Sequence, residues 1–455
     1  MTKPGGHPAS EGRRLAPSRE ALWGALVFVA ACALAWVRIP AGSQGVLWAE
    51  DGDTFLREQL ELGSIQALFH PYAGYQHFLP RILSVVAAEL VPLERFGVVV
   101  SLLSLLVAAL VCAGTFRLAR GIVTWLPARV GVALTPLLVP LVSREVLGDL
   151  ANLHTYCLWL VVWIFLSRTD ASRWERALWA VVTLACFLTE VQALVALPVL
   201  LVRLFWDRSR GTLLILGAAL VGAAGQLATW MLNPRPEYNA PHGPISLADI
   251  VVGWAATTVL PMWSGDTARN AELLGDHGIA ILMLAVVPFA LAVAAVLVFG
   301  RTADRVALPV LLVVAAAAFG GSMLVNSLTI FQYAGFSGDG WATAQLGNRY
   351  GAAAGIFALA SFPFAASVIV ERWGRRAPRA SRVVASAVLL GVGAVVALQW
   401  GAVPTDRLAA EPWEAQYRDA VAACSAEPAG ERTFAVAPGK SFALACEHLL
   451  RSAGK

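Results

Sequence analysis

Long apolar runs separated by short polar segments follow one another along almost the whole 455-residue chain. Many approach the ~20 residues with which an α-helix crosses a bilayer. Arginine gives the orientation, because cytoplasmic loops are enriched in Lys and Arg. Six arginine clusters are therefore placed inside: Arg13/Arg14/Arg19, Arg117/Arg120/Arg129, Arg168/Arg173/Arg176, Arg203/Arg208/Arg210, Arg301/Arg305 and the run from Arg372 to Arg382. The predicted spans are 20–39, 95–116, 128–143, 153–167, 176–189, 191–205, 212–232, 279–300, 306–326, 350–370 and 383–400.

These eleven crossings leave the N-terminus inside and the C-terminus outside. The apolar segment 77–92 is not counted, because it is short, carries Arg81 and Glu89, and as a crossing would move the arginines after span 95–116 outside. We predict instead a helix that lies at, or dips into, the outer membrane surface. The short spans on either side of Glu190 have an alternative interpretation as two half-helices that meet below the surface.

The chain divides into a cytoplasmic tail (1–19), a transmembrane module (20–400) and a small extracytoplasmic segment (401–455). The first apolar run is long enough to span, which favours an uncleaved first helix over a signal peptide. The longest loops fall outside, at 40–94, 233–278 and 327–349. The cytoplasmic loops are short and contain no nucleotide-binding motif, so chemistry or recognition is predicted on the outer face of a plasma (inner) membrane.

The composition of the chain is that of a membrane protein. The chain is 58% hydrophobic and 14% charged, with a mean hydropathy of +0.66, whereas soluble proteins carry about 25% charged residues. An all-α polytopic fold follows, because lipid forces every backbone polar group to be paired within the protein. The net charge of +4 is too small to indicate a nucleic-acid partner.

The six cysteines separate into two groups. Four lie in predicted spans and are interpreted as small core residues: Cys32, Cys112, Cys157 and Cys186. Cys424 and Cys446 lie in the outer segment, where disulfides persist. We predict a Cys424–Cys446 bond, with free thiols as the alternative. No Cys or His spacing indicates zinc.

Three carboxylates follow the first span directly, in the sequence WAEDGDTF. One interpretation is that Asp51 or Asp53 caps a helix that begins near Thr54. A cap needs one acid and does not explain three, so Glu50, Asp51 and Asp53 are candidate site residues. An amphipathic helix is predicted over residues 54–69, and PYAGYQHFLPR then adds Tyr72, Tyr75, His77 and Arg81.

The second outer loop, SREVLGDLANLHTY, also gathers polar side chains. A helix here would align Glu145 with Asp149, and Asp149 with Asn152, on one face. The alternative is a solvated loop with a helix cap at Asn152. His154 is a candidate as well, although a lone His at a helix end is more often structural. Glu190 lies within apolar sequence, where acids are costly and suggest function, unless its turn reaches the interface.

A third candidate group lies at LGNRYGAAAG, where an outer loop meets a span. Arg349 is predicted outside, whereas most arginines are placed on the cytoplasmic side. A guanidinium at the outer interface suits phosphate binding. The alternative is that the side chain snorkels to the lipid headgroups. Tyr350 follows Arg349. The preceding loop offers Asp339, Trp341 and Gln345, and loop 233–278 offers Arg235, Glu237, Tyr238 and His242 within a Pro-rich lid or connector.

The many spans, the acidic motif directly after the first of them, the interfacial helix and the outer tail with its cysteine pair together resemble the GT-C superfamily of glycosyltransferases. These integral membrane enzymes take sugars from lipid-linked donors on the outer face. The local match is Glu50 and Asp51 with Asp53 close by. GYQHFLPR, followed by Glu94-Arg95 and a long span, is similar to the mannosyl- and aminoarabinose-transferring members. The large soluble C-terminal domain of many members is replaced by about 55 residues.

The resemblance implies a polyprenyl-phosphate sugar donor, an extracytoplasmic glycan or glycolipid acceptor, and an inverting reaction without an obligate cofactor. It favours Asp51 as general base, with Glu50 as the alternative. Arg349 would bind the donor phosphate, with Arg81 and His77 as weaker candidates. Substrate contacts are assigned to Asp53, Tyr72, Tyr75, Glu145, Asp149, Asn152, His154, Glu190 and Tyr350. The close acids leave a divalent metal as an open alternative.

Two other functions remain as hypotheses. A transporter or lipid flippase would use intramembrane charges such as Glu190 for coupling, but no inverted repeat is visible. A non-catalytic membrane component would bind glycolipid through the same residues. In each case membrane lipids are partners.

Overall fold

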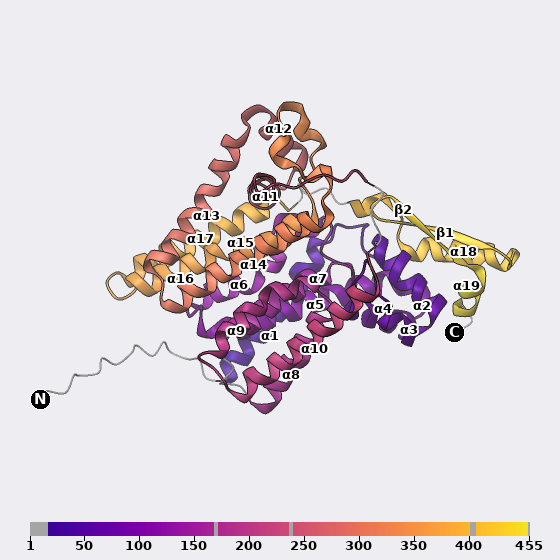
Figure 1. Cartoon of the computed structure of the whole chain (residues 1–455), viewed down its shortest axis with the longest axis horizontal. Coiled ribbons are helices and arrows are strands. Elements are labelled where there is room, and N and C mark those ends of the chain that lie inside the picture. The colour runs from indigo at the N-terminus through magenta and orange to yellow at the C-terminus, as the bar shows by residue number, and fades with distance from the viewer. Residues whose placement is uncertain (1–16, 168–171, 236–239, 401–405, 454–455) are drawn as a thin grey trace, which may run out of the picture.

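The computed structural model describes residues 17–167, 172–235, 240–400 and 406–453. Within them the protein is a helical membrane protein with one two-stranded sheet (Figure 1). Seven stretches are long and apolar enough to span a membrane. They contain α1 (Pro17–Arg38), α5 (Phe96–Leu118), α10 (Arg210–Leu232), α13 (Ile279–Phe299), α14 (Thr302–Asn326), the pair α15 (Arg349–Leu359) and α16 (Ser361–Trp373), and α17 (Pro378–Leu398).

Shorter apolar helices coincide with three of the remaining predicted spans. These are α6 (Leu126–Leu138), α7 (Leu153–Leu166) and α9 (Leu197–Leu204), the last preceded by η5 (Val191–Ala196). The predicted span 176–189 coincides with α8 (Arg173–Phe187). All eleven predicted spans therefore coincide with helix, but a count of eleven crossings stays a prediction. Short helical turns connect the longer helices: η2 (Leu93–Arg95), η3 (Ala119–Gly121), η4 (Pro140–Ser143), η8 (Thr329–Phe331) and η9 (Tyr333–Gly335).

The core lies around α7, which is apolar on every side and buried along almost its whole length. A helix with that pattern belongs in the interior of a protein. Trp159 and Trp163 pack edge to face at its centre, and Phe357 of α15 lies against Trp159. Large apolar side chains face outward instead on the peripheral helices, as at Leu291 and Leu390, which is the surface expected against lipid.

Ion pairs between distant segments divide the described residues into two sets. Segments predicted inside pair with one another, as Arg117 does with Glu175 at 2.8 Å. Segments predicted outside do the same, as Arg95 does with Glu414 at 3.0 Å. No ion pair among the described residues joins the two sets. This division is the one that the predicted topology requires; the alternation itself and the set that faces the cytoplasm stay predictions.

The first outer segment contains η1 (Asp51–Leu56), α2 (Arg57–Leu62), α3 (Ser64–Phe69) and α4 (Phe78–Leu90). The single helix predicted over 54–69 is divided at Gly63, whose φ of +82° favours glycine and ends α2. With 13 residues, α4 is about 20 Å long, shorter than the ~30 Å hydrocarbon core. Its predicted position at the membrane surface remains a prediction.

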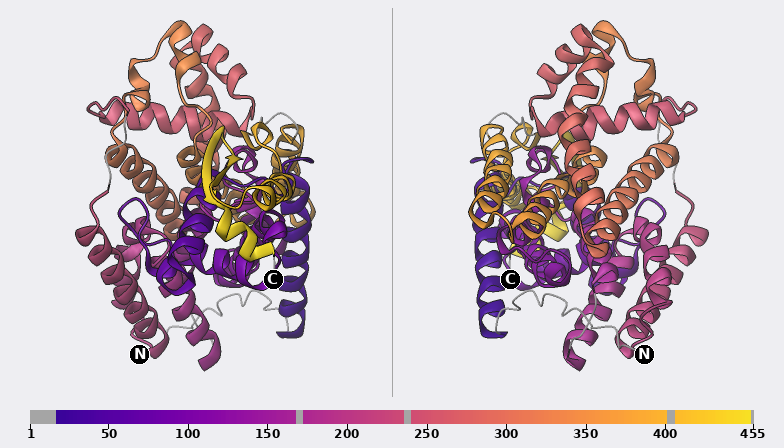
Figure 2. Two further views of the ribbon diagram at one scale, coloured as in Figure 1. Left: turned by 90° about the vertical axis from the view of Figure 1, so that its right-hand side faces the viewer. Right: turned by 90° about the vertical axis from the view of Figure 1, so that its left-hand side faces the viewer.

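The predicted connector 233–278 contains two helices, α11 (Leu247–Trp254) and α12 (Thr267–His277), with η6 (Ala255–Val259) and η7 (Leu260–Met262) between them. Asp266 caps α12, since its Oδ1 accepts from the N–H groups of Ala268 and Arg269 at 3.0 and 3.1 Å. α12 packs on η10 (Gly338–Thr343) and projects at the top of Figures 1 and 2. Glu237 and Tyr238 lie outside the described residues.

Residues 406–453 form a small C-terminal module of η11 (Asp406–Ala409), α18 (Trp413–Ala426), β1 (Glu431–Val436), β2 (Lys440–Ala445) and α19 (Cys446–Ala453). The strands are antiparallel, with Phe434 opposite Phe442. The predicted Cys424–Cys446 disulfide is confirmed and joins α18 to α19. The module lies beside the first outer segment (Figures 1 and 2), where the N–H of Ala437 donates to the carbonyl of Leu47 at 3.0 Å.

Candidate functional site

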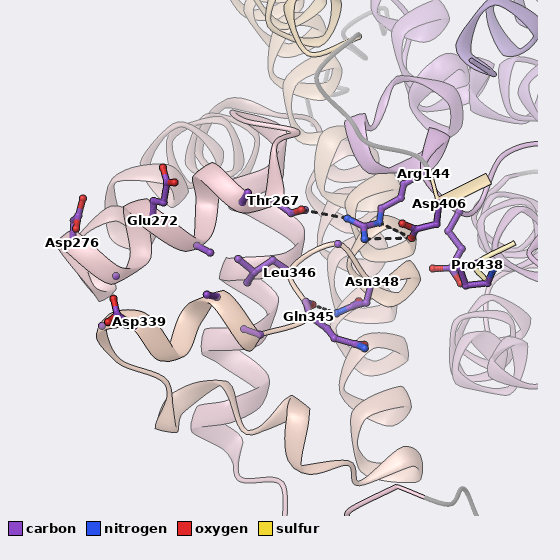
Figure 3. Close-up of a pocket in the computed structure, with 18 of the residues that line it drawn as sticks. Arg144, Thr267, Glu272, Asp276, Asp339, Gln345, Leu346, Asn348, Asp406 and Pro438 are labelled. Atoms are coloured by element: carbon purple, nitrogen blue, oxygen red, sulfur yellow. Dashed lines mark hydrogen bonds and ion pairs between the residues drawn. The ribbon is translucent and has the colours of Figure 1, made fainter. Parts of the chain in front are cut away.

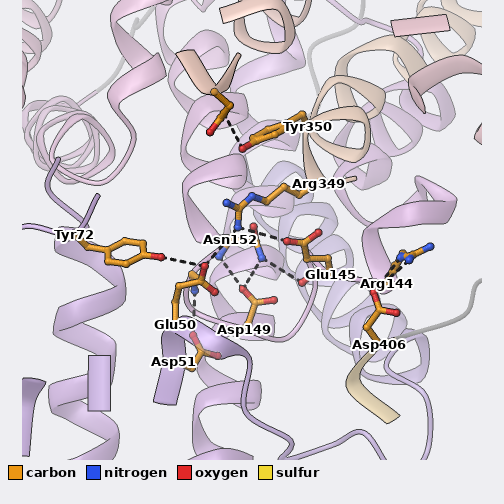
Figure 4. A network of polar contacts seen from close by, with 12 residues as sticks. Glu50, Asp51, Tyr72, Arg144, Glu145, Asp149, Asn152, Arg349, Tyr350 and Asp406 are labelled. Atoms are coloured by element: carbon orange, nitrogen blue, oxygen red, sulfur yellow. Dashed lines mark hydrogen bonds and ion pairs between the residues drawn. The ribbon is translucent and has the colours of Figure 1, made fainter. Parts of the chain in front are cut away.

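The candidate site lies where three segments that are far apart in the sequence meet (Figure 4). Glu50 follows the first span, Glu145 belongs to the second outer loop, and Arg349 is the first residue of α15. The Arg349 Nη1 atom lies 3.5 Å from Glu145 Oε1 and 3.8 Å from Glu50 Oε1. The side chains of Arg349, Glu145 and Glu50 are 28%, 19% and 12% exposed, in that order. Two carboxylates thus converge on one guanidinium at the edge of the apolar helices.

Tyr72 extends the network on the Glu50 side. Its Oη donates to Glu50 Oε1 at 3.2 Å, whereas Glu50 Oε2 is buried without a hydrogen-bond partner in the described structure. A tight turn holds Tyr72, because it exchanges backbone hydrogen bonds with Tyr75 at 3.0 and 3.1 Å. Ala73 and Gly74 both have positive φ at the turn's centre, as in a two-residue hairpin loop.

The second outer loop forms turns rather than the helix that would align Glu145 with Asp149. The reason is Gly148, whose φ is +89° and where a Cβ would lie 2.5 Å from Ile39 Cδ1. The loop is held instead by Asn152. Its Nδ2 donates to the Glu145 carbonyl at 3.3 Å and to Asp149 Oδ1 at 3.0 Å, and it makes no side-chain capping bond to α7.

Asp51 is fully buried beneath this loop. Its Oδ1 accepts from the N–H groups of Leu150 and Ala151 at 3.1 and 3.2 Å, and its Oδ2 has no hydrogen-bond partner among the described residues. Burial and the nearby Asp149 raise the pKa of Asp51 well above its usual value. Asp51 therefore joins the first outer segment to the second outer loop. The predicted helix cap is not formed, because η1 begins without a side-chain cap.

Asp149 is held by Arg407, a residue that no sequence motif indicated. The Arg407 Nη2 lies 2.6 Å from Asp149 Oδ2, and both side chains are buried. A second Arg407 nitrogen donates to the Gly148 carbonyl at 3.1 Å, and the guanidinium lies 5.6 Å from the Trp48 ring centre. Burial raises the pKa of Asp149 to about 7, while Arg407 and the Asn152 N–H lower it. Arg407 belongs to no motif, so only the folded chain reveals its partner.

His77 lies behind the network, in an aromatic enclosure. Its ring centre is 4.4 Å from that of Tyr75, 5.3 Å from Tyr72 and 5.9 Å from Phe55. The side chain is 97% buried, and within the described structure neither ring nitrogen has a hydrogen-bond partner. Burial, followed by the neighbouring His154 and two arginines, lowers the pKa of His77 well below its usual value. The ring is therefore neutral near pH 7.

Two predicted site residues lie in ion pairs that need no ligand. Arg81 is buried and pairs with Glu58 at 2.7 Å. Asp53 pairs with Arg57 at 3.3 Å along one helical face, and both side chains are more than a third exposed. The exposed ion pair favours a structural role for Asp53. The Arg81 Nε and Nη1 atoms are buried without a hydrogen-bond partner among the described residues, so Arg81 as a weaker candidate for the donor phosphate stays a prediction.

The remaining predicted residues border the site. His154 Nδ1 contacts Glu190 Oε2, and the other Glu190 oxygen accepts from the Gln192 N–H at 2.6 Å. On α15, the Tyr350 hydroxyl accepts from Asn326 at 3.0 Å, and Asn326 accepts from Arg235 at 2.9 Å. His242 lies apart, against Ser327, and Trp341 is buried within η10.

The two carboxylates of the site contact a cation of the protein, Arg349. Among the described residues, no group of three or more His, Cys, Asp or Glu side chains is arranged to hold a metal ion. Arg349 lies between the two carboxylates that a metal would otherwise join. No family model matches the chain, and no curated protein matches it. The likeness to the GT-C superfamily thus remains a prediction from motif and architecture.

Proposed function

We propose that the protein is a membrane glycosyltransferase that moves a sugar from a polyprenyl-phosphate donor to a hydroxyl of a glycan or glycolipid acceptor. The observation that carries this proposal is the convergence of Glu50 and Glu145 on Arg349. It joins a cation suited to the donor phosphate with a carboxylate suited to the acceptor hydroxyl. Both lie beside apolar helices in which a polyprenyl chain can stay anchored.

Arg349 is available to a phosphate. Guanidinium–carboxylate bonds are usually about 2.7–2.9 Å long, and its two contacts, at 3.5 and 3.8 Å, are looser. It also stands at the N-terminus of α15, where the helix dipole favours an anion. As the bond between sugar and phosphate breaks, negative charge grows on the phosphate, and a fixed cation there lowers the barrier.

Glu50 is the better placed general base. Both Asp51 oxygens are buried, and one already accepts two backbone N–H groups. The Glu50 side chain is instead 12% exposed and contacts Arg349 and Tyr72, while its Oε2, like the Oδ2 of Asp51, has no partner among the described residues. Glu50 is therefore the proposed general base, although the resemblance favoured Asp51 with Glu50 as the alternative. Asp51 is proposed to position the second outer loop.

In the proposed reaction the acceptor oxygen attacks the anomeric carbon on the face opposite the phosphate. Its proton passes to Glu50, a new carbon–oxygen bond forms, and the bond to the phosphate breaks. Polyprenyl phosphate leaves with the electron pair, and Glu50 then releases the proton to water. Base catalysis of this kind contributes about 10²–10⁴-fold.

The test uses the full chain in lipid nanodiscs with radiolabelled polyprenyl-phosphate mannose or polyprenyl-phosphate arabinose as donor, and octyl mannoside as acceptor. Glu50→Gln is expected to lower the transfer rate by about 100-fold or more. Asp53→Asn removes a carboxylate three residues away and is expected to keep the rate within about twofold, because Asp53 pairs at the surface. A Glu50→Gln protein that transfers sugar at the wild-type rate contradicts the base assignment. A wild-type protein that transfers neither sugar, but moves the donor across the bilayer, favours the transporter hypothesis.

A further inference from the structure

A cleft of about 960 Å³ lies next to the candidate site (Figure 3). This volume is typical of ligand pockets, which hold about 300–1,000 Å³. Three parts of the outer region form it: α12, the segment from Gly338 to Asn348, and the C-terminal module through Asp406 and Pro438. Trp48, Arg144 and Glu145 complete the lining. Of these three, Glu145 belongs to the Glu50–Arg349 network, so most of the cleft lies outside that network.

The cleft reaches the site at its inner end. Glu145 lines it, and the same Glu145 oxygen lies 3.5 Å from Arg349. Beside Glu145, the wall is the Arg144–Asp406 ion pair, at 3.3 Å. Gly347 packs directly against Arg144: a Cβ on that glycine would lie 2.5 Å from the guanidinium. A chain bound in the cleft therefore ends within reach of the proposed catalytic groups.

The lining of the cleft is strongly acidic. One arginine and five acids contribute to it, and the arginine, Arg144, is paired with Asp406. Glu272, Asp276 and Asp339 are exposed and form no ion pair with any described residue. Figure 3 places these three at the end of the cleft away from Arg144. A ligand at that end of the cleft thus lies beside three carboxylates that form no ion pair with a described residue.

We infer that this cleft binds the acceptor and that its acids select neutral or amino-bearing glycans against those that carry phosphate or carboxylate. The inference rests on the proposed function for the identity of the ligand as an acceptor. Sugar hydroxyls donate to carboxylates, and the Gln345 amide and Thr267 hydroxyl add further polar groups to the lining. An anionic glycan meets like charge in the cleft, which lowers its rate of association and its affinity.

Binding is measured without donor, so that it does not depend on catalysis. The full chain in nanodiscs of uncharged lipid is titrated with mannotetraose, with its terminal 6-amino-6-deoxy derivative and with its terminal 6-phosphate. The amino derivative is expected to bind at least as tightly as mannotetraose, and the phosphate about tenfold more weakly at low salt. The difference is expected to shrink as ionic strength rises, because exposed charges are screened.

Two variants locate the effect. Glu272→Gln/Asp276→Asn/Asp339→Asn is expected to remove most of the discrimination while keeping affinity for mannotetraose. Its matched control changes the same number of exposed acids on the C-terminal module: Asp419→Asn/Glu427→Gln/Glu447→Gln. Ala342→Trp places a large ring on an exposed lining position of the cleft and is expected to abolish binding of all three ligands, with thermal unfolding unchanged.

The outcomes separate this inference from the proposed function. Equal binding of the phosphate and mannotetraose, or no binding of either, overturns the cleft assignment. Sugar transfer that is insensitive to Ala342→Trp also overturns it and leaves the proposed function standing. Binding that follows the expected pattern, in a protein that transfers no sugar, supports a glycan-selective cleft and contradicts the proposed function.

Discussion

Arg349 and Arg407 contact the same acidic region, yet replacing each by methionine is expected to have opposite effects. Arg407 is 1% exposed and lies 2.6 Å from the fully buried Asp149. Because burial raises the pKa of Asp149 to about 7, unfolding is measured at pH 9, where the pair is ionised and removal of one partner costs about 3–5 kcal/mol. Arg407→Met is therefore expected to destabilise the fold by that amount, and Asp149→Asn in the same chain is expected to recover part of it.

Arg349 is 28% exposed, and its carboxylate contacts are 3.5 and 3.8 Å long. Loose, partly hydrated pairs contribute about 0–1 kcal/mol, so Arg349→Met is expected to leave the free energy of unfolding within about 1 kcal/mol of wild type. If Arg349 holds the leaving phosphate, the same change lowers sugar transfer by about 10²–10³-fold, as for loss of one donor to a developing anion.

The assay pairs two measurements on each variant. Equilibrium unfolding in mixed detergent–SDS micelles, followed by tryptophan fluorescence from the 16 Trp residues, gives the free energy of unfolding. Transfer from radiolabelled polyprenyl-phosphate donors gives the rate. The reasoning is refuted if Arg349→Met unfolds as readily as Arg407→Met, or if Arg407→Met is as stable as wild type.

Three further changes test other parts of the account. Below about pH 6.5 the unfolded chain binds a proton at His77 that the folded chain does not, because burial lowers the pKa of His77. The stability of the wild type relative to His77→Phe is therefore expected to fall by about 1.4 kcal/mol per pH unit below that point, in unfolding measured on both proteins between pH 5 and 7.5. Replacing Cys424 and Cys446 by alanine opens a bond that spans 22 residues, which is expected to destabilise the C-terminal module by about 3 kcal/mol and to speed its cleavage by trypsin. A Cβ at Gly52 would lie 2.5 Å from Phe442, so Gly52→Ala is expected to displace the β-hairpin from the acidic motif and to lower sugar transfer at least about tenfold.

Matched controls exist for two of these changes. His277 is exposed, so His277→Gln is expected to keep the wild-type pH dependence of stability. Gly24 has open space around its Cβ position, so Gly24→Ala is expected to leave transfer unchanged. Equal pH dependence in the His77 and wild-type proteins, or full activity of Gly52→Ala, contradicts the corresponding argument.

The helices could be predicted from sequence because lipid imposes a length and an apolar composition on each span. The disulfide could be predicted because Cys424 and Cys446 lie apart from the apolar runs. α11 and α12 were not predicted, although Ser246 and Asp266 supply capping signals at their starts. The Pro and Gly content of the surrounding segment outweighed these short signals.

The site was predicted only as separate groups. Sequence selected Glu50, Glu145 and Arg349 individually, but their contact depends on how distant helices pack. The loop around Asp149 was open to a helical interpretation, because the pattern of acids does not reveal the positive φ of Gly148. Arg407 carries no local signal, since its importance comes from a buried partner in another segment.

The central claim is that Arg349 binds the donor phosphate while the neighbouring Glu50 takes the proton of the acceptor hydroxyl. The most direct measurement is a cryo-EM structure of the Glu50→Gln protein in nanodiscs with polyprenyl-phosphate mannose. The account predicts phosphate oxygens about 3 Å from the Arg349 guanidinium, with the anomeric carbon facing residue 50. A donor whose phosphate is bound elsewhere and makes no contact with Arg349 contradicts it.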